Sequence, residues 1–220
     1  MRRNQVLLGA ILGFVVFYLI ATIALGSTPE TTATGVDVVR WFRTNGHHVR
    51  VWLWFSTFAL VFFGVYAAQV RRALPAPHRD AFFAGAITLI AVSSVQGWIW
   101  AGLALHPQRL QPATARLALD IASFWGPVLI CATILMLAPV AVLAFRGEAG
   151  LPRWLGWLVG VALAEQIIES ITIFGHRGFT APGGPMNLVL GALLTTIALL
   201  AVGVVVASQP APGHPATRST

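Results

Sequence analysis

The sequence predicts an all-α protein, a polytopic membrane helical bundle with six transmembrane helices. Hydrophobic residues make up 57% of the chain and charged residues 10%, whereas an ordinary soluble domain has about 25% charged residues. The mean hydropathy is +0.78. Six apolar runs each approach or exceed the ~20 residues needed to cross the hydrocarbon core of a bilayer. Because so few charges cannot cover a water-soluble surface, we expect an integral membrane protein.

The predicted spans form a single membrane domain over residues 1–207, and they cover residues 6–26, 51–70, 81–105, 117–145, 154–175 and 186–207. Pro127 and Pro139 predict kinks in the fourth span, because proline lacks a backbone N–H. An amphipathic segment at 36–45 is expected to lie on the outer leaflet, and Asn45-Gly46 is expected to end it. The tail at 208–220 is rich in proline and small polar residues, so it is predicted to be disordered.

The N-terminal region is expected to be retained as the first span. Arg2 and Arg3 before an apolar stretch would also suit a cleaved signal peptide, but the apolar core of a signal peptide has only about 7 to 15 residues. These arginines precede the span, whereas Glu30 and Asp37 follow it, which favours a cytoplasmic N-terminus. With six spans, the C-terminus is also cytoplasmic. The predicted location is the cell membrane, inner or plasma, with multiple passes.

The basic residues suggest lipid as the main partner. The sequence has 14 of them, all arginine, and its pI is about 11.4. They occur singly or in pairs near predicted helix ends, as anchors to lipid phosphates do, and not as one dense patch for nucleic acid. We therefore expect membrane lipids as partners and no nucleic acid, with a membrane-protein partner or a homo-oligomer left open. Cys131 is the single cysteine, so no internal disulfide can form.

Several local motifs are shared with a known group of proteins. Thr28-Pro29-Glu30 follows the first span, Arg71-Arg72 closes the second, and the run LPRWLGW at residues 151–157 opens the fifth. In these features the chain resembles the uncharacterised six-helix integral membrane proteins common in actinobacteria, over residues 26–175. The resemblance implies a six-helix fold and a bacterial inner membrane. It implies no activity and no site residues, and two glutamates in the fifth span depart from the pattern.

Those glutamates are the main candidates for a functional site. Glu165 and Glu169 lie in the middle and outer half of the fifth span, where a charge costs about 2.5 to 3.5 kcal/mol. Helical spacing places them on one face, which continues to Thr172 and His176. Two carboxylates one turn apart repel each other, so at least one is expected to hold a proton unless a cation lies nearby. Two interpretations stay open: a ligand or proton pathway, and packing groups that fix helix register.

Other polar residues are expected at the same outer level, around an outward-opening polar pocket. The pocket candidates are Ser93 and Gln96 on the third span and Asp120 and Ser123 on the fourth, with His47, His48, Arg50 and Arg177 at the outer mouth. Each has a simpler explanation as well. Asp120 lies four residues after Arg116 and is expected to pair with it, and Gln96 is expected to bond a neighbouring helix.

The motifs do not support cofactor chemistry, and we predict no cofactor, no metal site and no catalytic residue. His47, His48, Asp120, Glu165, Glu169 and His176 could supply metal ligands, but the sequence has neither an HxxxH nor an HExxH pair. No histidine lies in mid-span to bind haem. Three function classes remain: a protein that binds or moves a small ligand, cation or proton; a structural or accessory subunit; and an intramembrane enzyme.

Overall fold

The computed structural model describes residues 2–209, apart from the side chains of Arg2 and Arg3, and this part of the chain is helical without strands. The main helices are α1 (Arg2–Leu25), α2 (Gly35–Arg71), α3 (His78–Leu105), α4 (Pro112–Ser123), α5 (Trp125–Arg146), α6 (Arg153–Glu169) and α7 (Ala192–Ser208). Short 3₁₀ segments are η1 (Pro107–Arg109), η2 (Ser170–Phe174) and η3 (Gly178–Thr180), and η4 (Met186–Gly191) is π-helical. Most of the tail predicted to be disordered, residues 210–220, lies outside the described residues.

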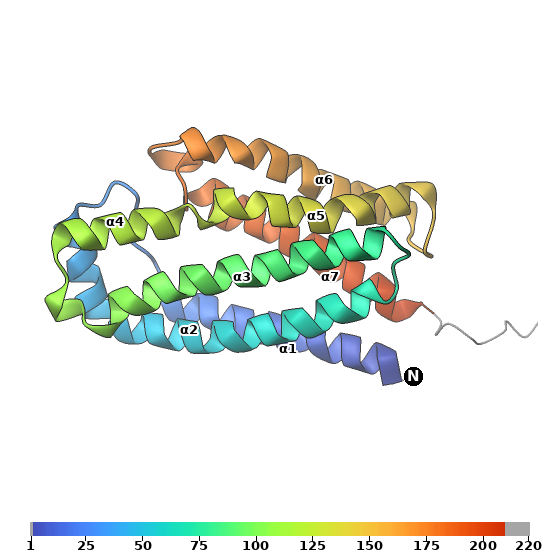
Figure 1. Cartoon of the computed structure of the whole chain (residues 1–220), viewed down its shortest axis with the longest axis horizontal. Coiled ribbons are helices and arrows are strands. Elements are labelled where there is room, and N and C mark those ends of the chain that lie inside the picture. Colours follow the sequence, from blue (N-terminus) through green and yellow to red (C-terminus); the bar gives the residue numbers. More distant parts are fainter. Residues whose placement is uncertain (1, 210–220) are drawn as a thin grey trace, which may run out of the picture.

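Six helices are long and apolar enough to cross a membrane, which confirms the all-helical prediction and the number of such helices. They are α1, α2, α3, α4 with α5, α6 with η2, and η4 with α7. α1 packs against α2, α2 against α3, α3 against α5, and α5 against α6. Figure 1 shows the N-terminus and the end of α7 at the same end of the bundle, here called the proximal end. The opposite end, near α4, is called the distal end.

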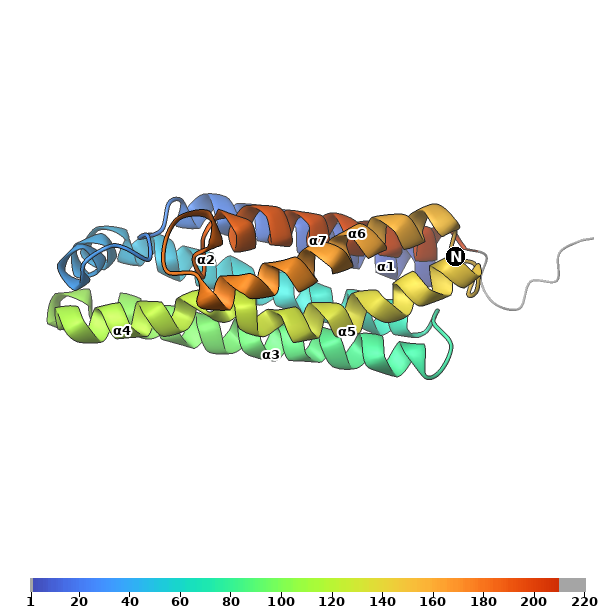
Figure 2. The same cartoon turned by 90° about the horizontal axis from the view of Figure 1, so that it is seen from above.

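The second helix is much longer than a membrane requires. It has 37 residues, or roughly 55 Å at 1.5 Å per residue, against about 30 Å of hydrocarbon. Its first turns, the end of α3, η1, α4 and the loop 26–34 form a distal head that extends beyond α6 (Figures 1 and 2). The buried residues of this head form a small core of their own: Val38, Val39, Phe42, Val49, Trp100, Leu103, Ala104, Ala115, Leu119 and Ala122.

The predicted break at Asn45-Gly46 is wrong, because α2 is continuous from Gly35 to Arg71. Gly46 is buried, and a Cβ atom there would lie 3.5 Å from the Ala104 carbonyl oxygen on α3. Glycine in a helix costs about 1 kcal/mol relative to alanine, and the close packing of α2 on α3 offsets this cost. Residues 36–45 therefore continue the axis of α2 as part of the distal head.

The interruption expected near Pro127 is present. α4 ends at Ser123 and α5 begins at Trp125, which places Pro127 in the first turn of α5. Proline is tolerated there because the first N–H groups of a helix have no partner within it. Pro139 lies inside α5.

Arg116 joins the loop after α1 to α4. Its Nη1 donates to the carbonyl oxygens of Glu30 at 3.3 Å and Ala33 at 3.0 Å, and its Nε donates to Asp120 Oδ1 at 3.0 Å. Asp120 thus pairs with Arg116, as the simpler interpretation of the sequence expected. This group fixes the loop 26–34 against the distal head.

Arg116→Ala is expected to release that loop without disturbing the helices of the main bundle. The variant removes the donors for two loop carbonyls, so the amides of residues 27–34 should exchange with deuterium faster. Hydrogen–deuterium exchange with mass spectrometry measures this, with Arg109→Ala, at an exposed arginine of the same head, as the control. Unchanged exchange in Arg116→Ala would contradict the role of this arginine.

Large apolar side chains are exposed on the outer faces of the bundle. Examples are Ile23 at 80%, Phe174 at 77% and Leu12 at 65% exposed. Soluble monomers rarely present continuous apolar surface of this extent. A lipid environment is the solvent that suits these faces.

Candidate functional site

Glu165 and Glu169 point into the bundle from α6. Glu165 is only 8% exposed and Glu169 only 3% exposed. Two irregular segments lie close to them. The helix α6 continues from Ser170 as the 3₁₀ segment η2, and the last apolar helix begins as the π-helical segment η4. Irregular helical turns of this kind are frequent at functional sites.

The amide of Gln166 joins the two carboxylates. Its Nε2 donates to Glu165 Oε2 at 2.9 Å and to Glu169 Oε2 at 2.6 Å. Its Oε1 accepts a hydrogen bond from the hydroxyl of Thr133 on α5. One side chain therefore bridges both glutamates and links α6 to α5.

A second amide joins the last apolar helix to the same group. Asn187 Nδ2 donates to Glu169 Oε1 and, at 3.3 Å, to Thr172 Oγ1. Its Oδ1 accepts from the backbone N–H of Gly183 at 2.9 Å. We use the name polar network for the residues Thr133, Glu165, Gln166, Glu169, Thr172 and Asn187. All of them except Glu165 form a side-chain hydrogen bond to a network residue on a different helix or segment.

Two glycines make room for these side chains. A Cβ atom on Gly191 would collide with Glu169 Oε2 and lie 3.1 Å from Gln166 Nε2. A Cβ atom on Gly126, at the start of α5, would lie 3.0 Å from Asn187 Cγ. The absence of a side chain at both positions lets polar groups from three helices meet.

Neither glutamate has a basic partner among the side chains that the structure describes. The ion pairs among residues 2–209 involve Asp37, Asp80 and Asp120, all near helix ends, and neither glutamate of the network. Both oxygens of Glu169 accept hydrogen bonds, as an ionised carboxylate does. Glu165 Oε1, by contrast, is buried and has no partner. Glu165 Oε1 is therefore the one oxygen of the pair that accepts no hydrogen bond.

The predicted pocket residues of the third span bond neighbouring helices, whereas those of the fourth span bond within their own helix. Ser93 Oγ accepts from Trp125 Nε1 at 3.4 Å, and Gln96 Nε2 donates to the Ala122 carbonyl oxygen at 3.5 Å. Ser123 Oγ donates to Leu119 O at 2.8 Å within its own helix. These bonds place Ser93, Gln96 and Ser123 outside the polar network.

A separate hollow of about 150 Å³ lies at the distal side of the network. Its lining consists of Thr31, Asp120, Ser123, Phe124, Gly175, His176 and Pro182. Gly183 lies between the hollow and Asn187. Its backbone N–H donates to Asn187, and its Cα lies beside Ser123, which lines the hollow. The structure thus divides the predicted site into a buried network and a distal hollow.

His176 does not continue the stripe of glutamates. The helical spacing that predicted it fails because α6 ends at Glu169 and η2 ends at Phe174. His176 lines the distal hollow instead, and Arg177 beside it is exposed. His47, His48 and Arg50 are exposed on the α2 part of the distal head and do not line this hollow.

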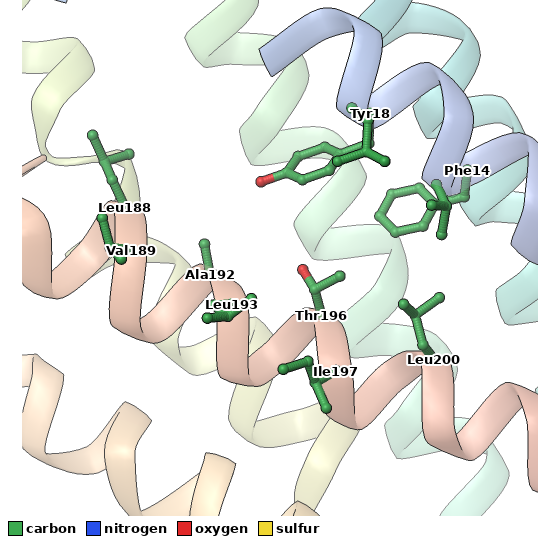
Figure 3. Close-up of a pocket in the computed structure, with 11 residues that line it drawn as sticks. Phe14, Tyr18, Leu188, Val189, Ala192, Leu193, Thr196, Ile197 and Leu200 are labelled. Atoms are coloured by element: carbon green, nitrogen blue, oxygen red, sulfur yellow. The ribbon is translucent and has the colours of Figure 1, made fainter. Parts of the chain in front are cut away.

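A larger groove of about 380 Å³ lies between α1 and the last apolar helix. Figure 3 shows Phe14 and Tyr18 on one side and Leu188, Leu193 and Thr196 on the other. Hydroxyl groups of Tyr18 and Thr196 are the polar side-chain groups among its lining residues. Neither glutamate lines this groove.

The sequence did not identify Thr133, Gln166 and Asn187 as network members. Each is a polar residue within an apolar run, which is a usable signal. Helical periodicity in the fifth span could not predict the contacts of the glutamates with Thr133 and Asn187, because these two residues are far from the glutamates in sequence.

Thr133→Val is expected to destabilise the protein by about 1 to 3 kcal/mol, because it leaves Gln166 Oε1 buried without a donor. Denaturation in detergent measures the loss. The matched control is Thr88→Val on α3, where the exposed hydroxyl bonds its own helix at Ala84 O and the effect should be within about 0.5 kcal/mol. A double-mutant cycle with Gln166→Leu should show coupling of at least about 0.5 kcal/mol; strictly additive effects would contradict the bond.

Within residues 2–209, no group of three or more histidine, cysteine, aspartate or glutamate side chains is close enough together to hold a metal ion. Comparisons with protein-family models, with curated proteins and with solved structures found no match to this chain.

Proposed function

We propose that this protein is a multi-pass protein of a bacterial inner membrane, like the actinobacterial proteins it resembles, and that the Glu165–Glu169 pair binds a proton within the membrane. Exposed tryptophans support the placement. Trp54 lies near the middle of the long helix α2 and Trp98 in the distal part of α3, 58% and 73% exposed; Trp154 and Trp157, 55% and 70% exposed, lie at the proximal end. Tryptophan is enriched at both membrane–water interfaces.

These two levels agree with the thickness of a bilayer. From Trp54 to Arg71 the helix rises roughly 26 Å, close to the ~30 Å hydrocarbon core. Glu165 lies roughly 17 Å along α6 from Trp154, near the middle. The distal head would then stand outside the membrane and both termini in the cytoplasm. Reporter fusions should place the loops at 72–77 and 147–152 in the cytoplasm; a periplasmic signal from either loop would overturn this orientation.

The observation that carries the function is the uncompensated carboxylate pair. Two ionised glutamates in a low-dielectric interior without a basic partner would repel each other, so a bound proton stabilises the pair. Gln166 and Asn187 donate to the other three carboxylate oxygens, which leaves Glu165 Oε1 as the oxygen that would hold the proton. An intramembrane ionisable group of this kind is a characteristic element of proton relays.

The distal side offers the shorter route to the pair. Only Gly183, whose N–H donates to Asn187, lies between the network and the distal hollow, which Asp120 and His176 line. On the proximal side the core is apolar, with Leu155, Val159 and Ala162 on α6 almost completely buried. We therefore propose that protons enter from outside the cell.

Infrared spectroscopy of the purified protein in lipid vesicles tests the proposal. The wild type should show a carboxylic-acid band that diminishes as pH rises and that Glu165→Gln removes. Glu148→Gln, at an exposed glutamate in the loop after α5, should keep it. A wild-type spectrum without any titrating carboxylic acid would overturn proton binding by this pair.

An accessory or structural subunit is the second candidate. The observation in its favour is that every polar atom of the Gln166 and Asn187 amides is used: Gln166 donates to both glutamates within α6 and accepts from Thr133 on α5, and Asn187 donates from η4 to α6 and η2. Such a saturated network can fix the register of α5, α6 and η4 without any transfer. In that case Glu165→Gln would leave growth and stability unchanged.

A further inference from the structure

Two buried polar atoms near the middle of the bundle have no hydrogen-bond partner. They are Glu165 Oε1 and Thr195 Oγ1, and both residues are 8% exposed. An unpaired buried polar group costs about 1 to 3 kcal/mol. If the two groups lie at the same height along the bundle axis on facing helices, one shared hydrogen-bond partner would satisfy both.

The packing of α6 against the last apolar helix sets the heights of Glu165 and Thr195 along the bundle axis. Gly191 lies against Glu169 and Gln166. Thr195 is four residues after Gly191, and Glu165 is four residues before Glu169. Because α6 and the last apolar helix run in opposite directions, both steps are about 6 Å towards the proximal end. Both steps also return to the same helical face. Glu165 and Thr195 thus occupy matching positions on facing helices.

We propose that Glu165 Oε1 and Thr195 Oγ1 bind one water molecule between them, which continues the polar network from α6 to α7. A water molecule of this kind needs two to four polar partners, and it can both donate and accept. The inference rests on the proposed function, because it assigns the partner that receives the proton of Glu165. It also makes Thr195 a positioning residue for proton transfer.

The transfer step is balanced without any other reactant. The O–H bond at Glu165 Oε1 breaks, and its electron pair stays on the carboxylate. A lone pair of the water oxygen forms the new O–H bond, so the products are a glutamate anion and a hydronium ion hydrogen-bonded to Thr195 Oγ1. The reverse step restores the carboxylic acid. An alkali ion is a poorer occupant, because the described oxygens at this level are few and such ions need several oxygen ligands.

A high-resolution structure of the full chain in lipid tests the site directly. The expected result is a density peak within about 2.7 to 3.2 Å of both oxygens, absent in Thr195→Val and present in Thr195→Ser. A direct hydrogen bond between Glu165 and Thr195, or apolar side chains filling the space, would overturn the proposal. The wild-type and Thr195→Ser structures decide the matter even if Thr195→Val does not fold.

A kinetic measurement tests the role of the site. After a rapid pH jump, the carboxylic-acid band should change about tenfold more slowly in Thr195→Val, the equivalent of one lost hydrogen bond at the transfer step. Thr195→Ser should restore the wild-type rate, and Thr196→Val, at the neighbouring position facing the apolar groove, should leave it unchanged. An equal rate in Thr195→Val with a band that still depends on Glu165 would overturn the water site alone. Loss of the band from the wild type would instead overturn the proposed function.

Discussion

Replacing Gly191 by alanine is expected to destabilise the bundle by about 2 to 4 kcal/mol, because the polar network must open to admit one methyl group. The new Cβ atom would collide with the Glu169 carboxylate and press on Gln166. If Glu169 moved away, the donors of Gln166 and Asn187 would lose their acceptor. Alanine also favours a helix over glycine by up to about 1 kcal/mol, which is too little to offset the loss.

Thermal or chemical denaturation in detergent measures this effect, and Gly9→Ala is the matched control. Gly9 lies on the exposed face of α1, and a Cβ atom there meets nothing within 4 Å. The control should be neutral or slightly stabilising. Similar stabilities for Gly191→Ala and Gly9→Ala would show that the network tolerates displacement and that Gly191 is not required for close packing.

Glu165→Gln is expected to abolish proton binding by the network while leaving stability almost unchanged. The glutamine oxygen can still accept from Gln166 Nε2, as Glu165 Oε2 does. Its NH₂ group would occupy the position of Oε1, the oxygen that we propose carries the proton, but it cannot titrate. Proton uptake by vesicles that contain the protein, followed with a pH-sensitive dye, measures the loss, and Glu148→Gln should behave as the wild type.

Glu169→Gln should behave differently, because both oxygens of Glu169 accept hydrogen bonds. A glutamine there would turn an NH₂ group towards the donor of either Gln166 or Asn187. We expect a loss of about 1 to 3 kcal/mol, measured by denaturation beside Glu165→Gln. Equal stabilities of the two variants would contradict the assignment of the proton to Glu165.

Glu165→Leu separates transport from packing. It removes the acceptor for one hydrogen of Gln166, so it should destabilise the bundle if the glutamate fixes helix register. If Glu165→Gln and Glu165→Leu both left stability, proton uptake and growth unchanged, the buried glutamates would have neither role.

The sequence by itself determined the class of the fold and pointed to the two glutamates at the centre of the candidate site. Apolar runs of membrane-spanning length are a local property, so the six apolar helices and the interruption near Pro127 could be predicted from composition and spacing. The same is true of Glu165 and Glu169, because a charged residue inside such a run is conspicuous. Their shared helical face also follows from a four-residue spacing.

Only the tertiary structure decided which groups complete the site. Thr133 and Asn187 meet the glutamates because α5, α6 and η4 pack together, and no local pattern specifies that approach. Gly46 stays helical because α3 packs against it, although glycine by itself favours a break. His176 leaves the stripe because regular helix ends at Glu169. For Gly46, contacts between helices outweigh a local preference of about 1 kcal/mol, since burial and hydrogen bonding in the bundle contribute more.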